Sequence, residues 1–197
     1  MFQTAKFFIN LAQKTPRIKD SVVLGLLSGL IGTIPMDIID SVFWMFGKHE
    51  MLYGHLAGSM IFRPIRTNRK ENFLIGHVMH LLTGSGLGYL ITGFLKITGK
   101  DHHLIKGSFI GMLGWMTLYE FGQRVKWFTL KAHKSSTFYT AFLMNLVYGM
   151  TTAQAVVSLA HPSVFNNKKI EQNTPIQPVS NFYTDSQTID TPVEYSI

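Results

Sequence analysis

The sequence predicts an all-α fold, an integral membrane bundle of four helices, and two observations lead to it. Hydrophobic residues make up 46% of the chain and charged residues only 15%, against about 25% in soluble domains. Residues 72–95 and 135–160 carry no formal charge, and each run exceeds the ~20 residues that cross a hydrocarbon core. Neither run has the polar face of a soluble surface helix. The alternative is a soluble all-α bundle of very apolar helices.

A membrane domain over residues 1–161 accounts for most of the chain. It begins with a short amphipathic segment, 1–14, which predicts an interfacial helix. The third span has only 13 uncharged residues between Lys106 and Glu120 and is the weakest. The apolar run 51–62 is too short to cross and predicts an interfacial insert. The predicted spans are about 21–46, 73–97, 103–123 and 136–160.

The composition also bounds the tail, the partners and the location. Residues 162–197 are rich in Asn, Thr, Ser, Gln and Pro, and we expect them to be disordered. The chain has no cysteine, so it has neither disulfides nor thiolate metal ligands. The net charge of +7 comes from Lys and Arg between apolar runs, where they suit lipid headgroups rather than nucleic acid. We expect a multi-pass protein of the cell membrane. The basic residues divide nine and nine between the two sides, so they set no orientation.

The spans share two patterns of small residues. The glycines of the first span have the same spacing as those of the third, at an offset of 82 residues. His80, Gly84 and Gly88 have the same spacing as Asn145, Gly149 and Ala153, at an offset of 65. The matches suggest two tandem two-span units. Small residues let helices approach closely in lipid, so we predict helix packing at Gly25, Gly29, Gly32, Gly84, Gly88, Gly107, Gly111, Gly114 and Gly149.

Polar residues gather at one depth, on the side of the loop between the first two spans. Asp37 and Asp40 lie near the end of the first span, and His77 and His80 near the start of the second. Acids inside an apolar span are costly and need a partner. Two carboxylates facing two imidazoles form a candidate site for a divalent metal, Zn²⁺, Fe²⁺ or Mn²⁺. The structural alternative is that Asp–His pairs satisfy one another and fix the helix register. Direction around the helix favours Asp40 over Asp37 as the partner of the histidines.

Further residues lie around this candidate site. Asn145 and Tyr148 share one stripe of the fourth span, and His55 belongs to the loop on the same side. His49, Glu50 and Tyr53 of that loop are placed to cap the site or to act as ordinary interfacial residues.

Three classes of function follow, and the sequence does not establish a catalysed reaction. The first is a small membrane protein that associates with itself or with a membrane partner through its glycine faces. The second is a proton, ion or small-solute transport element that uses Asp40, His77 and His80. The third is a membrane-embedded metal-dependent enzyme that uses the same three residues together with Asp37.

Overall fold

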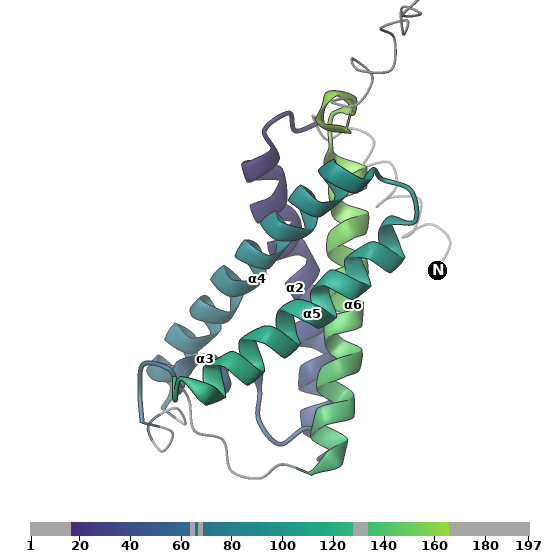
Figure 1. Cartoon of the computed structure of the whole chain (residues 1–197). Coiled ribbons are helices and arrows are strands. Elements are labelled where there is room, and N and C mark those ends of the chain that lie inside the picture. The colour runs from purple at the N-terminus through teal and green to yellow at the C-terminus, as the bar shows by residue number, and fades with distance from the viewer. Residues whose placement is uncertain (1–16, 64–65, 67–68, 128–133, 166–197) are drawn as a thin grey trace, which may run out of the picture. The chain divides into compact units, whose positions relative to one another are not determined.

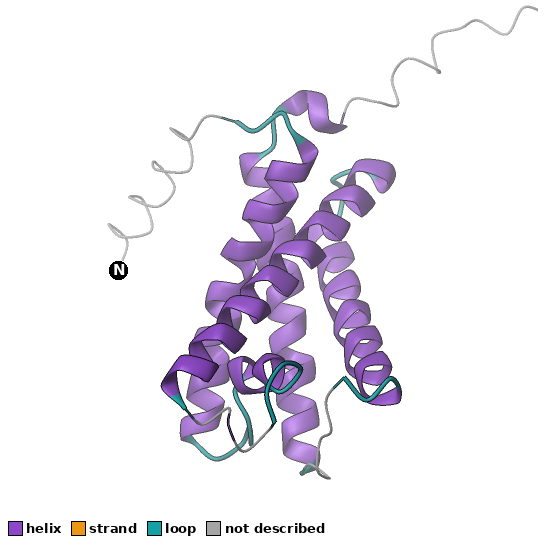
Figure 2. Ribbon diagram, turned by 90° about the vertical axis from the view of Figure 1, so that its left-hand side faces the viewer, coloured by secondary structure: helices purple, strands orange, loops and turns teal. Residues whose placement is uncertain are grey.

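The computed structural model describes residues 17–63, 66, 69–127 and 134–165. Within these residues the chain is all-helical (Figures 1 and 2). Their one β-bridge joins Ile18 to Ala160. The predicted interfacial helix at 1–14 lies outside the described residues. The helices are α2 (Ser21–Met45), α3 (Tyr53–Gly58), α4 (Lys70–Thr98), α5 (His103–Arg124), α6 (Ser135–Leu159) and the 3₁₀ helix η2 (Pro162–Phe165).

Three of these helices, α2, α4 and α6, are long and apolar enough to cross a membrane. The predicted third span forms a helix at the expected place, but α5 is not among the three. Lys106, Glu120 and Arg124 lower its hydropathy. The sequence therefore predicted the positions of the four long helices, whereas length and apolar character support three of them as spans.

The helix ends follow from local chemistry. The side chain of Asp20 caps α2 by accepting hydrogen bonds from Val22 N and Val23 N at 2.7 and 2.9 Å. Helix α4 ends at Gly99, whose φ of 84° favours glycine. The ammonium group of Lys106 donates to the carbonyl oxygens of Thr98 and Gly99, both at 3.0 Å. Lys106 therefore provides hydrogen-bond donors for carbonyl groups at the end of α4 and does not disrupt α5.

The glycines place α2 directly on α4. A Cβ at Gly29 would come within 3.0 Å of backbone atoms of Gly84, Ser85 and Gly88. The contacting residues recur every fourth position on both helices: Gly25, Gly29 and Thr33 on α2, and Gly84 and Gly88 on α4. Rows of this spacing interdigitate when helices cross at a substantial angle. The residues of α2 that contact α4 therefore shift around the helix toward its C-terminus and do not form one stripe parallel to the helix axis.

The same arrangement joins α5 to α6. Gly107 and Gly111 lie against Gly149 and its neighbours, again four residues apart. The third glycine of each pattern contacts a helix of the other pair. Gly32 of α2 meets Thr152 of α6, and Gly114 of α5 meets Leu87 of α4. These two contacts are equivalent, because adding 82 to 32 gives 114 and adding 65 to 87 gives 152.

The predicted insert folds against the rest of the chain. Helix α3 packs under the start of α4, where Gly76 lies against the backbone of Gly54 and Gly58. A carboxylate oxygen of Glu50 accepts hydrogen bonds from Lys134 N and Thr137 Oγ1 at the start of α6. The tail predicted from residue 162 begins with η2, in which Val164 is buried. Its remainder, 166–197, lies outside the described residues.

Candidate functional site

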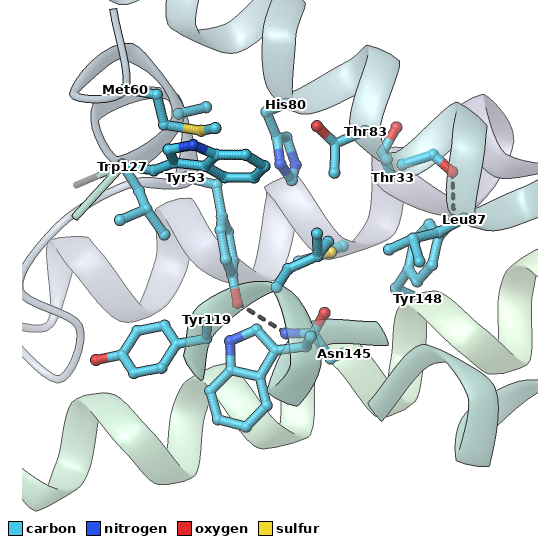
Figure 3. A pocket seen from close by; sticks show the side chains of 16 residues that line it. Thr33, Tyr53, Met60, His80, Thr83, Leu87, Tyr119, Trp127, Asn145 and Tyr148 are labelled. Carbon is cyan, nitrogen blue, oxygen red and sulfur yellow. Dashed lines mark hydrogen bonds between the residues drawn. The ribbon is translucent and has the colours of Figure 1, made fainter. Parts of the chain in front are cut away.

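A half-open cavity of about 210 Å³ lies among the helices, on the side of the insert (Figure 3). All five α-helices line it, and most of its wall is apolar. Four lining residues remain exposed and mark its mouth, which lies between α4, α5 and the segment after α3. They are Met60, Thr83, Leu118 and Trp127.

Corresponding positions of the two helix pairs face each other across this cavity. At the offsets of 82 and 65 residues, four residues of α2 and α4 match four residues of α5 and α6, and all eight line the wall. The pairs are Thr33 with Trp115, Met36 with Leu118, His80 with Asn145, and Thr83 with Tyr148. The cavity is therefore bounded by both repeats of the sequence pattern.

Tyr53 of α3 is the central polar residue of the cavity. Its hydroxyl oxygen accepts a hydrogen bond from Asn145 Nδ2 at 2.9 Å (Figure 3). The same amide group donates to Ala141 O at 2.8 Å. The hydroxyl group of Tyr53 also carries a proton that it can donate. Burial raises the pKa of this phenol, and the Asp40 carboxylate raises it further. Tyr53 is therefore a neutral hydrogen-bond donor.

His80 enters the cavity with its ring stacked on Tyr53, at a centroid separation of 5.1 Å and an interplanar angle of 12°. Its partner is Asp37, whose Oδ1 lies 3.0 Å from His80 Nε2. His77 Nε2 lies 3.8 Å from the other oxygen of Asp37. The prediction that Asp40 would be the partner of these histidines is therefore wrong. Asp37 follows Thr33 by four residues, so it lies on the row that contacts α4, which a straight stripe does not anticipate.

Asp40 has a different role, although it is almost completely buried. Its Oδ1 lies 2.5 Å from His49 Nδ1, and its Oδ2 accepts a hydrogen bond from Tyr53 N at 3.0 Å. Both partners follow α2 in the chain: His49 precedes the predicted insert 51–62, and Tyr53 belongs to it. Asp40 therefore joins this segment to α2 and sets the position of Tyr53.

The four residues proposed as metal ligands do not converge. Asp37 pairs with His77 and His80, while Asp40 pairs with His49. No group of three or more His, Asp or Glu side chains suited to a metal ion occurs in the described parts of the chain. This geometry supports the structural alternative, in which Asp–His pairs satisfy one another, and gives no support to a Zn²⁺, Fe²⁺ or Mn²⁺ site.

The other predicted residues divide between the cavity and the helix contacts. Tyr148 lines the cavity and donates a hydrogen bond to Gly84 O at 2.5 Å. His55 lies outside the cavity lining and packs on Phe73, with ring centroids 4.7 Å apart. Burial lowers the pKa of His55, and the Asp40 carboxylate opposes that shift.

Sequence reasoning missed most of the apolar wall. Trp115 is 7% exposed and contacts Tyr119 and Phe138, but it belongs to no polar motif. A usable signal was present, because Trp115 lies four residues after Gly111 on the row that faces α6. Following rows of four residues along both helix pairs would have found it.

Comparisons of the chain with protein families, with curated proteins and with solved structures found no match. What the site can do is therefore judged from its geometry and chemistry.

Proposed function

We propose that this chain is a multi-pass protein of the cell membrane that binds a small apolar or amphipathic molecule in the cavity around Tyr53. The molecule enters from the bilayer, through the mouth between α4 and α5. The observation that carries the proposal is the cavity itself: a half-open, mostly apolar space with a few polar groups, opening between helices. Binding sites for small molecules have this character.

In this proposal α5 also crosses the bilayer, which brings the number of spans to four. Its length of 22 residues exceeds the ~20 that a crossing needs. Large apolar side chains are exposed along it, among them Ile105 at 71%, Phe109 at 52% and Phe121 at 49%. Exposed apolar surface of this extent needs cover, and lipid supplies it. Lys106 and Arg124 lie near its two ends, where long basic side chains reach the headgroups.

The four spans form two tandem two-span units in this proposal. The equivalent contacts of Gly32 with Thr152 and of Gly114 with Leu87 support it, as do the matched residues of the cavity wall. The contacts between units differ in side-chain size. Thr152 lets α2 approach α6, whereas the bulkier Leu87 stands at the equivalent place between α4 and α5. The cavity opens at this second contact.

The size and polarity of the cavity limit the ligand. A volume of about 210 Å³ is somewhat larger than the ~150 Å³ cavity that holds benzene in an engineered protein. One ring therefore fits inside, and its substituents would extend through the mouth into lipid. The Tyr53 hydroxyl and the Asn145 amide supply the polar contacts, since both lie at the cavity wall.

The alternatives drawn from the sequence are less well supported. The chain already uses its glycine faces for internal contacts between α2 and α4 and between α5 and α6, so those faces do not carry association with a second copy or a partner. The hypothesis of a transport path through Asp40, His77 and His80 is also less well supported, because Asp40 is paired separately from the two histidines.

Quenching of Trp115 fluorescence tests the proposal. The chain has three tryptophans, so the double variant Trp44→Phe/Trp127→Phe keeps Trp115 alone. The protein would be placed in lipid nanodiscs and titrated with para-bromoneopentylbenzene, a neutral ring with a heavy-atom quencher. We expect saturable quenching, because the ligand occupies a limited site beside a buried indole.

Two sets of controls separate the cavity from the bilayer. A protein that keeps only Trp44, which does not line the cavity, should show quenching that rises linearly with probe. In the Trp115-only protein, Thr83→Phe should weaken binding about tenfold or more by filling the mouth. Thr98→Phe should not weaken binding, because Thr98 does not line the cavity. It is a matched control, since both threonines are exposed and each donates a hydrogen bond to the carbonyl oxygen four residues earlier. Linear quenching of Trp115 would refute the proposal.

A further inference from the structure

We propose that the ligand of this cavity is a small lipophilic organic cation, such as a quaternary ammonium group that carries an aromatic ring. This inference rests on the proposed function and adds the charge of the ligand. Three features of the cavity support it: an aromatic wall, two carboxylates immediately behind the polar residues, and a lining without Lys or Arg.

The wall of the cavity is rich in electron-rich rings. Five aromatic residues line it, from α3, α5, α6 and the segment after α5: Tyr53, Trp115, Tyr119, Trp127 and Tyr148. The faces of such rings attract cations, tryptophan most strongly, and the attraction grows where water is excluded. An alkylated ammonium is suited to this wall because it needs no hydrogen-bond acceptor, which an apolar surface does not provide.

Two carboxylates stand behind this wall. Asp37 bonds His80 at 3.0 Å, and Asp40 accepts a hydrogen bond from Tyr53 N at 3.0 Å. Both carboxylates therefore lie next to residues of the cavity wall. Burial is the largest cause of the raised pKa of the Tyr53 phenol, and the Asp40 and Asp37 carboxylates raise it further, so their charge acts at the cavity wall.

The charges nearby decide the sign of the ligand. An anion inside the cavity would be repelled by the two carboxylates. None of the residues that line the cavity is a Lys or Arg that would pair with the anion. A compact, strongly hydrated ammonium such as that of lysine would lose its water without gaining acceptors. A lipophilic cation loses little hydration, gains the ring faces and is attracted by both carboxylates.

A pair of probes of equal shape isolates the charge. Para-bromobenzyltrimethylammonium and para-bromoneopentylbenzene differ in one atom, a positive nitrogen in place of a carbon. Both would be titrated against the protein that keeps Trp115 alone, in nanodiscs of phosphatidylcholine, which has no net charge. Dissociation constants would be corrected for the partitioning of each probe into protein-free nanodiscs. We expect the cation to bind about tenfold more tightly or better.

Substitutions assign the preference to the carboxylates. Asp37→Asn and Asp40→Asn should each reduce the ratio of cation to neutral affinity several-fold, whereas Asp101→Asn, in the loop between α4 and α5, should leave it unchanged. The comparison of the two probes leaves Asp37 and Asp40 unsubstituted, so it decides even if Asp40→Asn fails to fold.

The outcomes distinguish the two proposals. Equal or tighter binding of the neutral probe overturns the cation inference and leaves the proposed function intact. Tighter binding of para-bromophenylacetate, a matched anion, also overturns the inference. If none of the three probes gives saturable quenching, the proposed function itself fails.

Discussion

At the residue scale, Asp37 and Asp40 are only three positions apart but have different structural roles. Asp37 is partly exposed and orients His80, whereas Asp40 is buried and joins His49 and Tyr53 N to α2. The sequence identified both acids and both histidines of α4, because acids in apolar spans demand partners. It assigned the partners wrongly, because the pairing depends on how α2 and α4 cross, and a crossing angle is a property of two helices together.

The two acids should therefore differ in their effect on stability. Asp40→Asn removes the charged carboxylate from its contacts with His49 and Tyr53 N, and a neutral amide makes weaker hydrogen bonds to them, so we expect it to lower the free energy of unfolding by about 1–3 kcal/mol. Asp37→Asn should cost less, because its carboxylate is less buried than that of Asp40, with 23% of the side chain exposed. Unfolding in mixed micelles would measure both. Equal losses would contradict the separate roles.

His55 should make stability depend on pH. Burial lowers the pKa of its folded imidazole below the ordinary 6.5, so the unfolded chain binds more protons in the interval between the two values. Stability from this group is therefore complete above pH ~6.5 and is lost as the pH falls toward the folded pKa. His55→Gln should lose less stability between about pH 7.5 and 5.5 than the native chain does. An unchanged slope of unfolding free energy against pH would contradict this effect.

At the scale of elements, rows of small residues every fourth position set how the helices meet. This feature was visible in the sequence as two glycine patterns, and the structure uses it in both pairs, α2 with α4 and α5 with α6. The insert was less predictable. Its length indicated a segment that cannot cross, but the burial of Tyr53 under α4 depends on Gly54, Gly58 and Gly76 meeting.

Two glycine substitutions test the helix contact. Gly29→Ala should lower the free energy of unfolding by about 2 kcal/mol or more, because its Cβ would meet the backbone of Gly84, Ser85 and Gly88. The matched control is Gly86→Ala on α4, where no atom lies within 4 Å of the added Cβ. It should be neutral or stabilise by up to about 1 kcal/mol. Similar effects at both positions would show that α2 and α4 do not pack as described.

At the scale of the whole molecule, the positions of α4 and α6 were predictable, because uncharged runs of span length mark both helices in the sequence. The cavity was not. It depends on the side chains that stand at equivalent contacts, Leu87 in one and Thr152 in the other, and sequence patterns alone do not show which contact stays open. The proposal of four spans requires that the two ends of α5 lie on opposite sides of the bilayer.

Cysteine labelling tests that topology, since the chain has no native cysteine. Single cysteines at Lys100, before α5, and at Lys126, after it, would be exposed to an impermeant maleimide in oriented vesicles. We expect one site to react in intact vesicles and the other only after permeabilisation. Phe109→Cys, within α5, should react in neither condition. Reaction of Lys100→Cys and Lys126→Cys from the same side would show that α5 does not cross.

The most direct test of ligand binding is the location of bromine in a crystal of the protein soaked with para-bromoneopentylbenzene. Anomalous scattering places bromine without assumptions about the surrounding chain. Binding in the cavity predicts one dominant peak among Tyr53, Trp115 and Asn145, lost in Thr83→Phe and retained in Thr98→Phe. A dominant peak on the outer faces of the helices, with none in the cavity, would contradict the function proposed here.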